Sequence, residues 1–163
     1  MSEQVEHLWQ LADESATVAL GRAIGKALKD RPDGFTVFLE GDLGAGKTTL
    51  CRGLLQSFGH SGAVKSPTYT LVEDYELDDR HIHHFDLYRL GDPEELEYMG
   101  IRDYFGPGHI CVLEWPERGR GILPEADLRV KVTVSGSGRQ AQLSAGSGKG
   151  QSLVNELPAG SPE

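Results

Sequence analysis

The fold is decided by residues 35–58, which read FTVFLEGDLGAGKTTLCRGLLQSF. The apolar and β-branched run at residues 35–39 predicts a short strand, and a glycine-rich loop follows it at once. From Lys47 a helix is predicted to run to about Phe58, where Gly59 supplies the left-handed residue that commonly ends helices. This order of strand, loop and helix is typical of an α/β fold.

The loop at residues 41–48 fits the phosphate-binding pattern G-x-x-x-x-G-K-[ST], placed between a predicted strand and a predicted helix. Its glycines let the backbone wrap so that successive N–H groups point at the phosphates, and the helix start adds partial positive charge. We expect Lys47 to reach the β- and γ-phosphates of a nucleoside triphosphate and the Thr48 hydroxyl to coordinate Mg²⁺. The other loop residues expected to contact the nucleotide are Asp42, Leu43, Gly44, Ala45 and Gly46.

Two carboxylates are candidates to complete the metal site. Glu114 ends the apolar run at residues 109–113, which is typical of a buried parallel strand, and Asp86 ends a second strand-like stretch. Both would emerge at the carboxyl edge of the sheet, where α/β folds bind ligands. We expect Glu114 to be a metal ligand or water-orienting group and Asp86 a second carboxylate near the metal, although these roles can be exchanged. Lys47, Asp86 and Glu114 are thus the expected catalytic residues, and Trp115 either flanks the nucleotide or packs as a buried aromatic.

Two further features bear on the ligand. Small GTPases recognise guanine with an N-K-x-D segment, and the only asparagine here, Asn155, is followed by Glu156, so ATP is the expected nucleotide. His81 and His83 would share one face of a strand, as a transition-metal pair could. Because no further ligand stands at a suitable spacing, a packed or solvent-facing role is favoured over a metal site.

The rest of the chain predicts one domain with a mixed, largely parallel central sheet, flanking helices and an antiparallel hairpin. We expect a single P-loop ATPase domain over residues 1–157 and a disordered tail at 158–163. A helix is predicted at residues 13–29 with Asp13 or Ser15 as its N-cap, a hairpin at 69–77 and 81–87, a helix start at 92–95, and paired strands at 128–135 and 140–144.

Composition limits the classes of partner. The formal net charge is −9, from 25 acidic and 16 basic residues, which disfavours autonomous nucleic-acid binding. No apolar run approaches the roughly 20 residues that span a bilayer, and residues 1–10 lack the features of a secretory signal. We therefore expect a cytoplasmic protein without membrane contact, and the separated Cys51 and Cys111 indicate neither a disulfide framework nor a zinc site.

Several segments together resemble the TsaE family, also called YjeE, the bacterial ATPases of tRNA threonylcarbamoyladenosine biosynthesis. The likeness runs from about residue 13 to about residue 145 and is carried by residues 41–49, 65–72, 84–90, 99–105 and 114–117. The resemblance implies a small P-loop ATPase that supports turnover of two partner proteins, TsaD and TsaB. In that family TsaD transfers the threonylcarbamoyl group to adenosine 37 of tRNAs that read codons beginning with A, so this chain would meet tRNA only through the complex.

The resemblance also assigns roles to residues. It implies phosphate and Mg²⁺ contacts from Lys47 and Thr48, a Mg²⁺ contact from Glu114, and an acid near the metal at Asp86. The matched loop extends to Thr49, which joins the expected nucleotide contacts, and residues 68–70 correspond to a switch-like segment near the γ-phosphate. The family brings the start of its N-terminal helix and a C-terminal strand residue to the base, which points here to Thr17 and Arg139.

Two other functions remain open from sequence. A small-molecule or nucleoside kinase shares the strand, loop and helix, but such enzymes usually bring arginines to the phosphate on a lid. The stretch after Glu114 offers Arg118 and Arg120 and soon becomes strand-like, so no convincing lid is visible. The second alternative is a nucleotide-switched binding module with negligible hydrolysis, which would carry the same residues.

Overall fold

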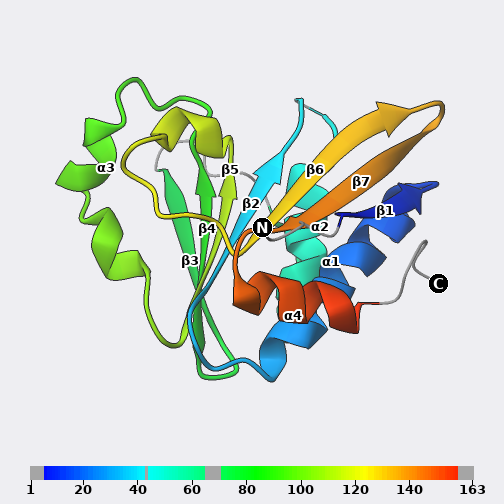
Figure 1. Ribbon diagram of the computed structural model, residues 1–163, viewed down its shortest axis with the longest axis horizontal. Coiled ribbons are helices and arrows are strands. Elements are labelled where there is room, and N and C mark those ends of the chain that lie inside the picture. The colour runs from blue at the N-terminus through cyan, green and yellow to red at the C-terminus, as the bar shows by residue number, and fades with distance from the viewer. Residues whose placement is uncertain (1–5, 43, 65–70, 158–163) are drawn as a thin grey trace.

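A seven-stranded sheet runs through this computed structural model, which describes residues 6–42, 44–64 and 71–157 (Figure 1). The strands are β1 (Glu6–Leu11), β2 (Phe35–Glu40), β3 (Val72–Leu77), β4 (Arg80–Asp86), β5 (His109–Glu114), β6 (Leu128–Ser135) and β7 (Gly138–Ala145). The helices are α1 (Glu14–Lys29), α2 (Lys47–Ser57), α3 (Glu94–Tyr98) and α4 (Gly148–Glu156), with 3-10 helices η1 (Ile101–Tyr104) and η2 (Pro116–Gly119).

The strand order is β1-β7-β6-β2-β5-β4-β3. The four central strands, β6, β2, β5 and β4, are mutually parallel, whereas β3, β7 and β1 pair with their neighbours in antiparallel fashion. The predicted mixed α/β sheet with an antiparallel hairpin is therefore confirmed, and β2 lies in the middle of its parallel part.

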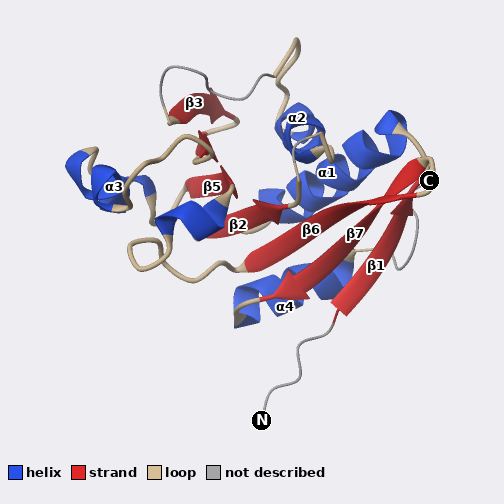
Figure 2. Ribbon diagram, turned by 90° about the horizontal axis from the view of Figure 1, so that it is seen from above, coloured by secondary structure: helices blue, strands red, loops and turns tan. Residues whose placement is uncertain are grey.

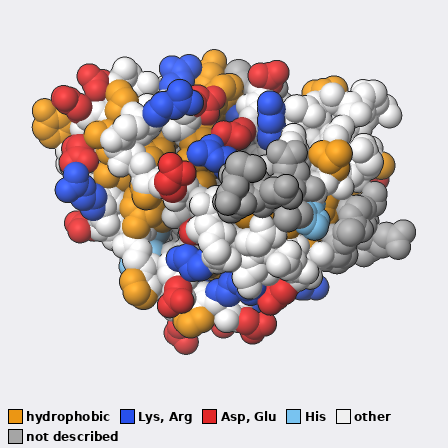
Figure 3. Space-filling view, viewed as in Figure 1, with side chains coloured by type: hydrophobic (Ala, Val, Ile, Leu, Met, Phe, Trp, Pro, Cys, Tyr) orange, Lys and Arg blue, Asp and Glu red, His pale blue; other side chains and the backbone are white. Residues whose placement is uncertain are grey.

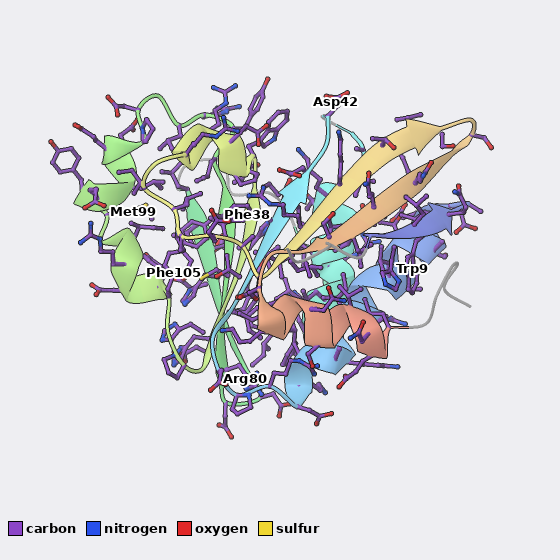
Figure 4. All side chains as sticks on the ribbon, in the orientation of Figure 1. Trp9, Phe38, Asp42, Arg80, Met99 and Phe105 are labelled. Carbon is purple, nitrogen blue, oxygen red and sulfur yellow. The ribbon has the colours of Figure 1, made fainter. Side chains whose placement is uncertain are left out.

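The central strands are buried on both faces. Alternate residues of β2 face opposite sides, so that Val37 packs in the cluster under α1 and α2 while Phe38 packs in the cluster with α3 and η1. Figure 2 shows α1 and α2 together on one face and α3 well apart from them, beside β3 to β5. In Figure 4, Phe38, Met99 and Phe105 lie in the part of the molecule that holds α3 and its neighbouring strands. Burial on both faces explains why β2 and β5 are continuous apolar runs.

Helices α1 and α2 touch at their backbones. The structure places a glycine at each close approach: a Cβ at Gly21 would overlap the Leu50 carbonyl oxygen, and one at Gly53 would overlap that of Val18. The start of α1 is set by Asp13, whose Oδ1 accepts a hydrogen bond from the Ala16 N–H at 2.9 Å, as predicted for this N-cap. The close contact between α1 and α2 fixes α2, and with it the loop before α2, against the sheet.

One strand and one α-helix were not predicted. β1 pairs with β7 and buries Trp9 and Leu11, although Leu8, just before Trp9, is half exposed. α4 is capped by Ser147 and buries only three residues, Gly150, Leu153 and Val154. The predicted helix start at residues 92–95 is shifted by one residue, because the Asp92 carboxylate accepts from the Glu94 N–H and α3 begins at Glu94.

The predicted strand at 69–77 is observed from Val72, and its first two residues lie outside the described ranges, as does the predicted tail at 158–163. Within the described ranges, no helix combines the length and apolar character needed to cross a bilayer.

The close contact of α1 with α2 predicts that Gly53→Ala destabilises the protein. Alanine normally favours a helix interior over glycine by roughly 0.5–1 kcal/mol, yet the new methyl group would overlap the Val18 backbone. We expect a net loss of about 1–3 kcal/mol of unfolding free energy in urea titrations. Gly148→Ala is the matched control, since a Cβ there meets nothing within 4 Å, and a Gly53→Ala variant as stable as this control would contradict the packing described.

Candidate functional site

The loop between β2 and α2 emerges from the middle of the sheet and depends on its glycines. Gly41 has φ 142°, and a Cβ there would overlap the Val132 carbonyl oxygen. Gly46 is the N-cap of α2 with φ 109°, a left-handed value that L side chains rarely adopt. Asp42 is exposed and stands at the tip of the loop (Figure 4). The result is a concave backbone followed by a helix N-terminus, the arrangement that binds phosphates in proteins.

Lys47 holds its positive charge inside this loop. Its side chain is buried, and Nζ donates a hydrogen bond to the Gly41 carbonyl oxygen at 2.6 Å. Nζ also lies 3.7 Å from the ring centroid of Trp115. Burial lowers the pKa of Lys47, and the Glu114 and Asp86 carboxylates counteract that effect. A largely dehydrated cation in this position is well suited to an anionic ligand.

The two predicted carboxylates lie side by side at the end of the sheet. β4 and β5 pair in a register that sets Asp86 opposite Glu114, and β5 pairs with β2 so that Glu114 stands opposite Leu39, just before the loop. The Thr48 hydroxyl donates to Glu114 Oε2 at 2.9 Å. Strand register thus brings both carboxylates to the loop, as the sequence predicted.

Thr48 and Glu114 fit a magnesium ion. Two oxygens bound side by side in an octahedral Mg²⁺ shell, each at about 2.1 Å, lie about 3 Å apart. The observed separation of Thr48 Oγ1 and Glu114 Oε2 is 2.9 Å. Among the described residues no group of three or more histidine, cysteine or acidic side chains could hold a metal. Mg²⁺ commonly takes one or two carboxylates from a protein and relies on phosphates and water for its other ligands.

His84 belongs to the same cluster, although the sequence analysis did not assign it there. Its Nε2 lies 2.6 Å from Glu114 Oε2, and its side chain is fully buried. Burial lowers the pKa of His84, but the nearby Cys51 sulfur and the Glu114 carboxylate raise it more, to about 10. The other ring nitrogen, Nδ1, makes no well-formed hydrogen bond among the described residues, although Cys51 lies close enough to raise the pKa of the ring. Strand alternation was the available signal, since residues 84 and 86 share a face.

Trp115 flanks the loop and packs at the border of the core cluster that contains Phe38. It is partly exposed, and its ring contacts the Lys47 ammonium and stands 5.0 Å from the Tyr88 ring. Its φ of 58° is a left-handed value, which is uncommon for an aromatic residue and is found at functional sites where surrounding contacts enforce it. The ring thus stands beside the loop and also packs on the cluster that contains Phe38, so a contact with the nucleotide stays a prediction.

A cavity of about 320 Å³ opens beside the loop on the side of α1 and β7. Thr17 and Arg139, the residues expected near the base, both line it together with Thr49. Arg139 Nη2 also donates to the Gly44 carbonyl oxygen at 3.2 Å, which ties β7 to the loop. Gly44, Ala45 and Gly46 complete the wall next to the phosphate-binding backbone. The structure therefore brings these residues together; Leu43 and the switch-like segment at 68–70 lie outside the described residues.

The histidine pair raised as a possible metal site lies on the other face of the sheet. His83 is bonded through Nδ1 to Asp74 at 2.7 Å and through Nε2 to His109 Nδ1 at 2.9 Å. His81 stacks on His109 with ring centroids 4.8 Å apart. These rings pair with each other and with acids instead of converging on a point, in agreement with the packed role that the sequence favoured.

Comparisons with known proteins show which family the chain resembles. The family model "Threonylcarbamoyl adenosine biosynthesis protein TsaE" matches residues 11–141. Proteins named tRNA threonylcarbamoyladenosine biosynthesis protein TsaE include one from Haemophilus influenzae, 58% identical over 73% of this chain and 75% of the relative. Another, from Bacillus subtilis, is 31% identical over 91% of this chain and 92% of the relative. The crystal structure of Bacillus subtilis YdiB superposes with a TM-score of 0.75 at 25% identity, covering 96% of this chain and 97% of that one.

The contact between Lys47 and Trp115 predicts a fluorescence response to phosphates. Pyrophosphate or ATP bound in the loop would attract the Lys47 ammonium and change the surroundings of the indole. We expect the emission of the wild-type chain to change on addition of either compound, because the other tryptophan, Trp9, is fully buried. The response should be absent in Trp115→Phe, and its persistence in that variant would show that ligand binds elsewhere.

Proposed function

The chain belongs to the TsaE family, and on that premise we propose that it binds MgATP and hydrolyses it in support of tRNA threonylcarbamoyladenosine biosynthesis. One observation carries the proposal: Thr48 and Glu114 hold two oxygens 2.9 Å apart at the start of α2, directly beside the buried Lys47. A glycine-rich loop, a buried lysine, a hydroxyl and a strand-end carboxylate are together the parts that P-loop NTPases use.

Each residue then has a defined task. The loop backbone and Lys47 bind the β- and γ-phosphates, while Thr48 and Glu114 hold Mg²⁺, with Asp86 as the nearby second acid. The ion, when bound, neutralises charge on the β- and γ-phosphate oxygens. Glu114 and Asp86 are both candidates to orient the attacking water, since they are paired in register at the same edge. The cavity lined by Thr17, Thr49 and Arg139 receives the adenine and ribose.

Partners complete the activity in this proposal. TsaD and TsaB, which the resemblance implies, would perform the transfer to tRNA, and this chain would supply ATP turnover in the cytoplasm. The net charge of −9 supports tRNA binding by the partners rather than by this chain. On the face shown in Figure 3, acidic and basic side chains are interspersed among the described residues instead of forming a broad basic surface.

The kinase alternative gains no support from the described residues. After Glu114 the chain forms the short 3-10 helix η2. Arg118 in η2 packs over the Tyr88 ring, with its guanidinium carbon 5.6 Å from the ring centroid.

Phosphate release from ATP by the purified chain, alone and with TsaD and TsaB, tests the proposal. We expect Mg²⁺-dependent release that the partners increase. Lys47→Ala should weaken ATP binding at least tenfold, because the buried cation is lost, whereas Lys26→Ala on the exposed side of α1 should change nothing. Glu114→Gln should keep ATP binding in the absence of magnesium and lower the rate roughly 10²-fold, the scale of a lost catalytic acid or base.

Three outcomes would contradict the proposal. Release of phosphate only with a small-molecule acceptor would indicate a kinase. ATP binding without release, even with the partners, would indicate a nucleotide-switched module. Unchanged ATP binding in Lys47→Ala would mean that the loop is not the nucleotide site.

A further inference from the structure

His84 lies in the middle of the site yet has no part in the phosphate-binding motif. It comes from β4, where Ile82, His84 and Asp86 alternate onto the face covered by α2. In the pairing of β4 with β5, His84 stands opposite Val112, two residues before Glu114, so the two side chains are diagonal neighbours. Its ring reaches across this diagonal, and Nε2 approaches Glu114 Oε2 to 2.6 Å.

We propose that His84 is a positioning residue that donates a hydrogen bond from Nε2 to Glu114 Oε2 and holds this carboxylate toward Thr48. The inference rests on the proposed function, in which Glu114 contacts magnesium. A carboxylate oxygen accepts, so Nε2 carries the hydrogen. The same oxygen accepts from the Thr48 hydroxyl at 2.9 Å, so one acceptor joins β4, β5 and the first turn of α2.

The burial of His84 is hard to explain by stability alone. The ring is fully buried, and Nδ1 has no hydrogen-bond partner among the described residues. An apolar side chain of similar size would fill this position without the cost of burying an unpaired polar atom. The one well-formed hydrogen bond that the ring makes within the described chain goes to Glu114, which is itself 3% exposed. The cost of burying His84 is therefore linked to the placement of Glu114.

The hydrogen bond from His84 to Glu114 matters for metal binding because its donor lies on a strand and not in the loop. When Thr48 turns its oxygen to an ion, Glu114 loses the hydrogen bond from the loop. The bond from His84 comes from a neighbouring strand and can persist through that change of partner. Outer partners of this kind typically alter metal affinity 10- to 100-fold when they are removed. His84 thus keeps the carboxylate from swinging away between nucleotide binding and release.

Two amide variants test the proposal in the full chain. His84→Gln places an amide nitrogen near the position of Nε2, whereas His84→Asn ends near the position of Nδ1 and leaves Glu114 without its donor. The measurement is the affinity for a non-hydrolysable ATP analogue, by calorimetry, in EDTA and across a magnesium titration. We expect His84→Asn to raise the magnesium concentration for half-maximal effect about tenfold or more and His84→Gln to stay within about threefold of the wild type.

The affinity in EDTA separates positioning from a general structural role. It should stay within about twofold of the wild type in both variants, because neither touches the phosphate-binding backbone. His83→Asn makes the same substitution one residue away on the opposite face, where it contacts Asp74 and His109, and should leave the magnesium dependence unchanged. Equal magnesium dependence in His84→Gln and His84→Asn would overturn the inference, as would a parallel loss of affinity in EDTA.

The same experiment distinguishes a failure of the proposed MgATP site from a failure of the role of His84. If the wild-type chain binds the analogue with no response to magnesium, the MgATP site itself is contradicted, and the positioning role falls with it. If the wild type responds and both variants match it, only the role of His84 is overturned.

Discussion

β5 pairs in parallel with β2 on one side and with β4 on the other. The register of these pairings determines which residues lie together at the carboxyl edge of the sheet. Because Glu114 stands opposite Leu39 and Asp86 stands opposite Glu114, the loop after β2 meets two carboxylates at one edge. A slip of one residue would turn Glu114 to the opposite face, away from α2. The cluster under α1 and α2 and the cluster under α3 together fix this register from both sides of the sheet.

Three ionisable side chains are buried together at this edge of the sheet. Lys47, His84 and Glu114 are all buried, and each has a partner: the Gly41 carbonyl oxygen for Lys47, and Glu114 for His84. Buried ion pairs contribute little to stability compared with apolar packing. Their concentration at one point beside a glycine-rich loop is therefore better explained by ligand binding than by folding.

The features that depend on local sequence patterns could be predicted from the sequence. Continuous apolar runs identified β2 and β5, the loop pattern identified Lys47 and Thr48, and strand ends identified Asp86 and Glu114. It missed β1, where exposed Leu8 obscures the alternation of Trp9 and Leu11 and pairing with β7 supplies the stability. It also missed α4, a glycine-containing segment that forms because Ser147 caps it and it packs on β7. The contact of His84 with Glu114 depends on the register between two strands, which one sequence does not reveal.

The proposed function requires a nucleotide and its metal at the edge where β2, β4 and β5 end. A crystal structure of the chain with Mg²⁺ and a non-hydrolysable ATP analogue tests it most directly. It should show the triphosphate wrapped by residues 41–48 and the ion about 2.1 Å from Thr48 Oγ1, with Glu114 as a ligand or one water away. A triphosphate bound elsewhere, or an ion held away from both Thr48 and Glu114, would contradict it.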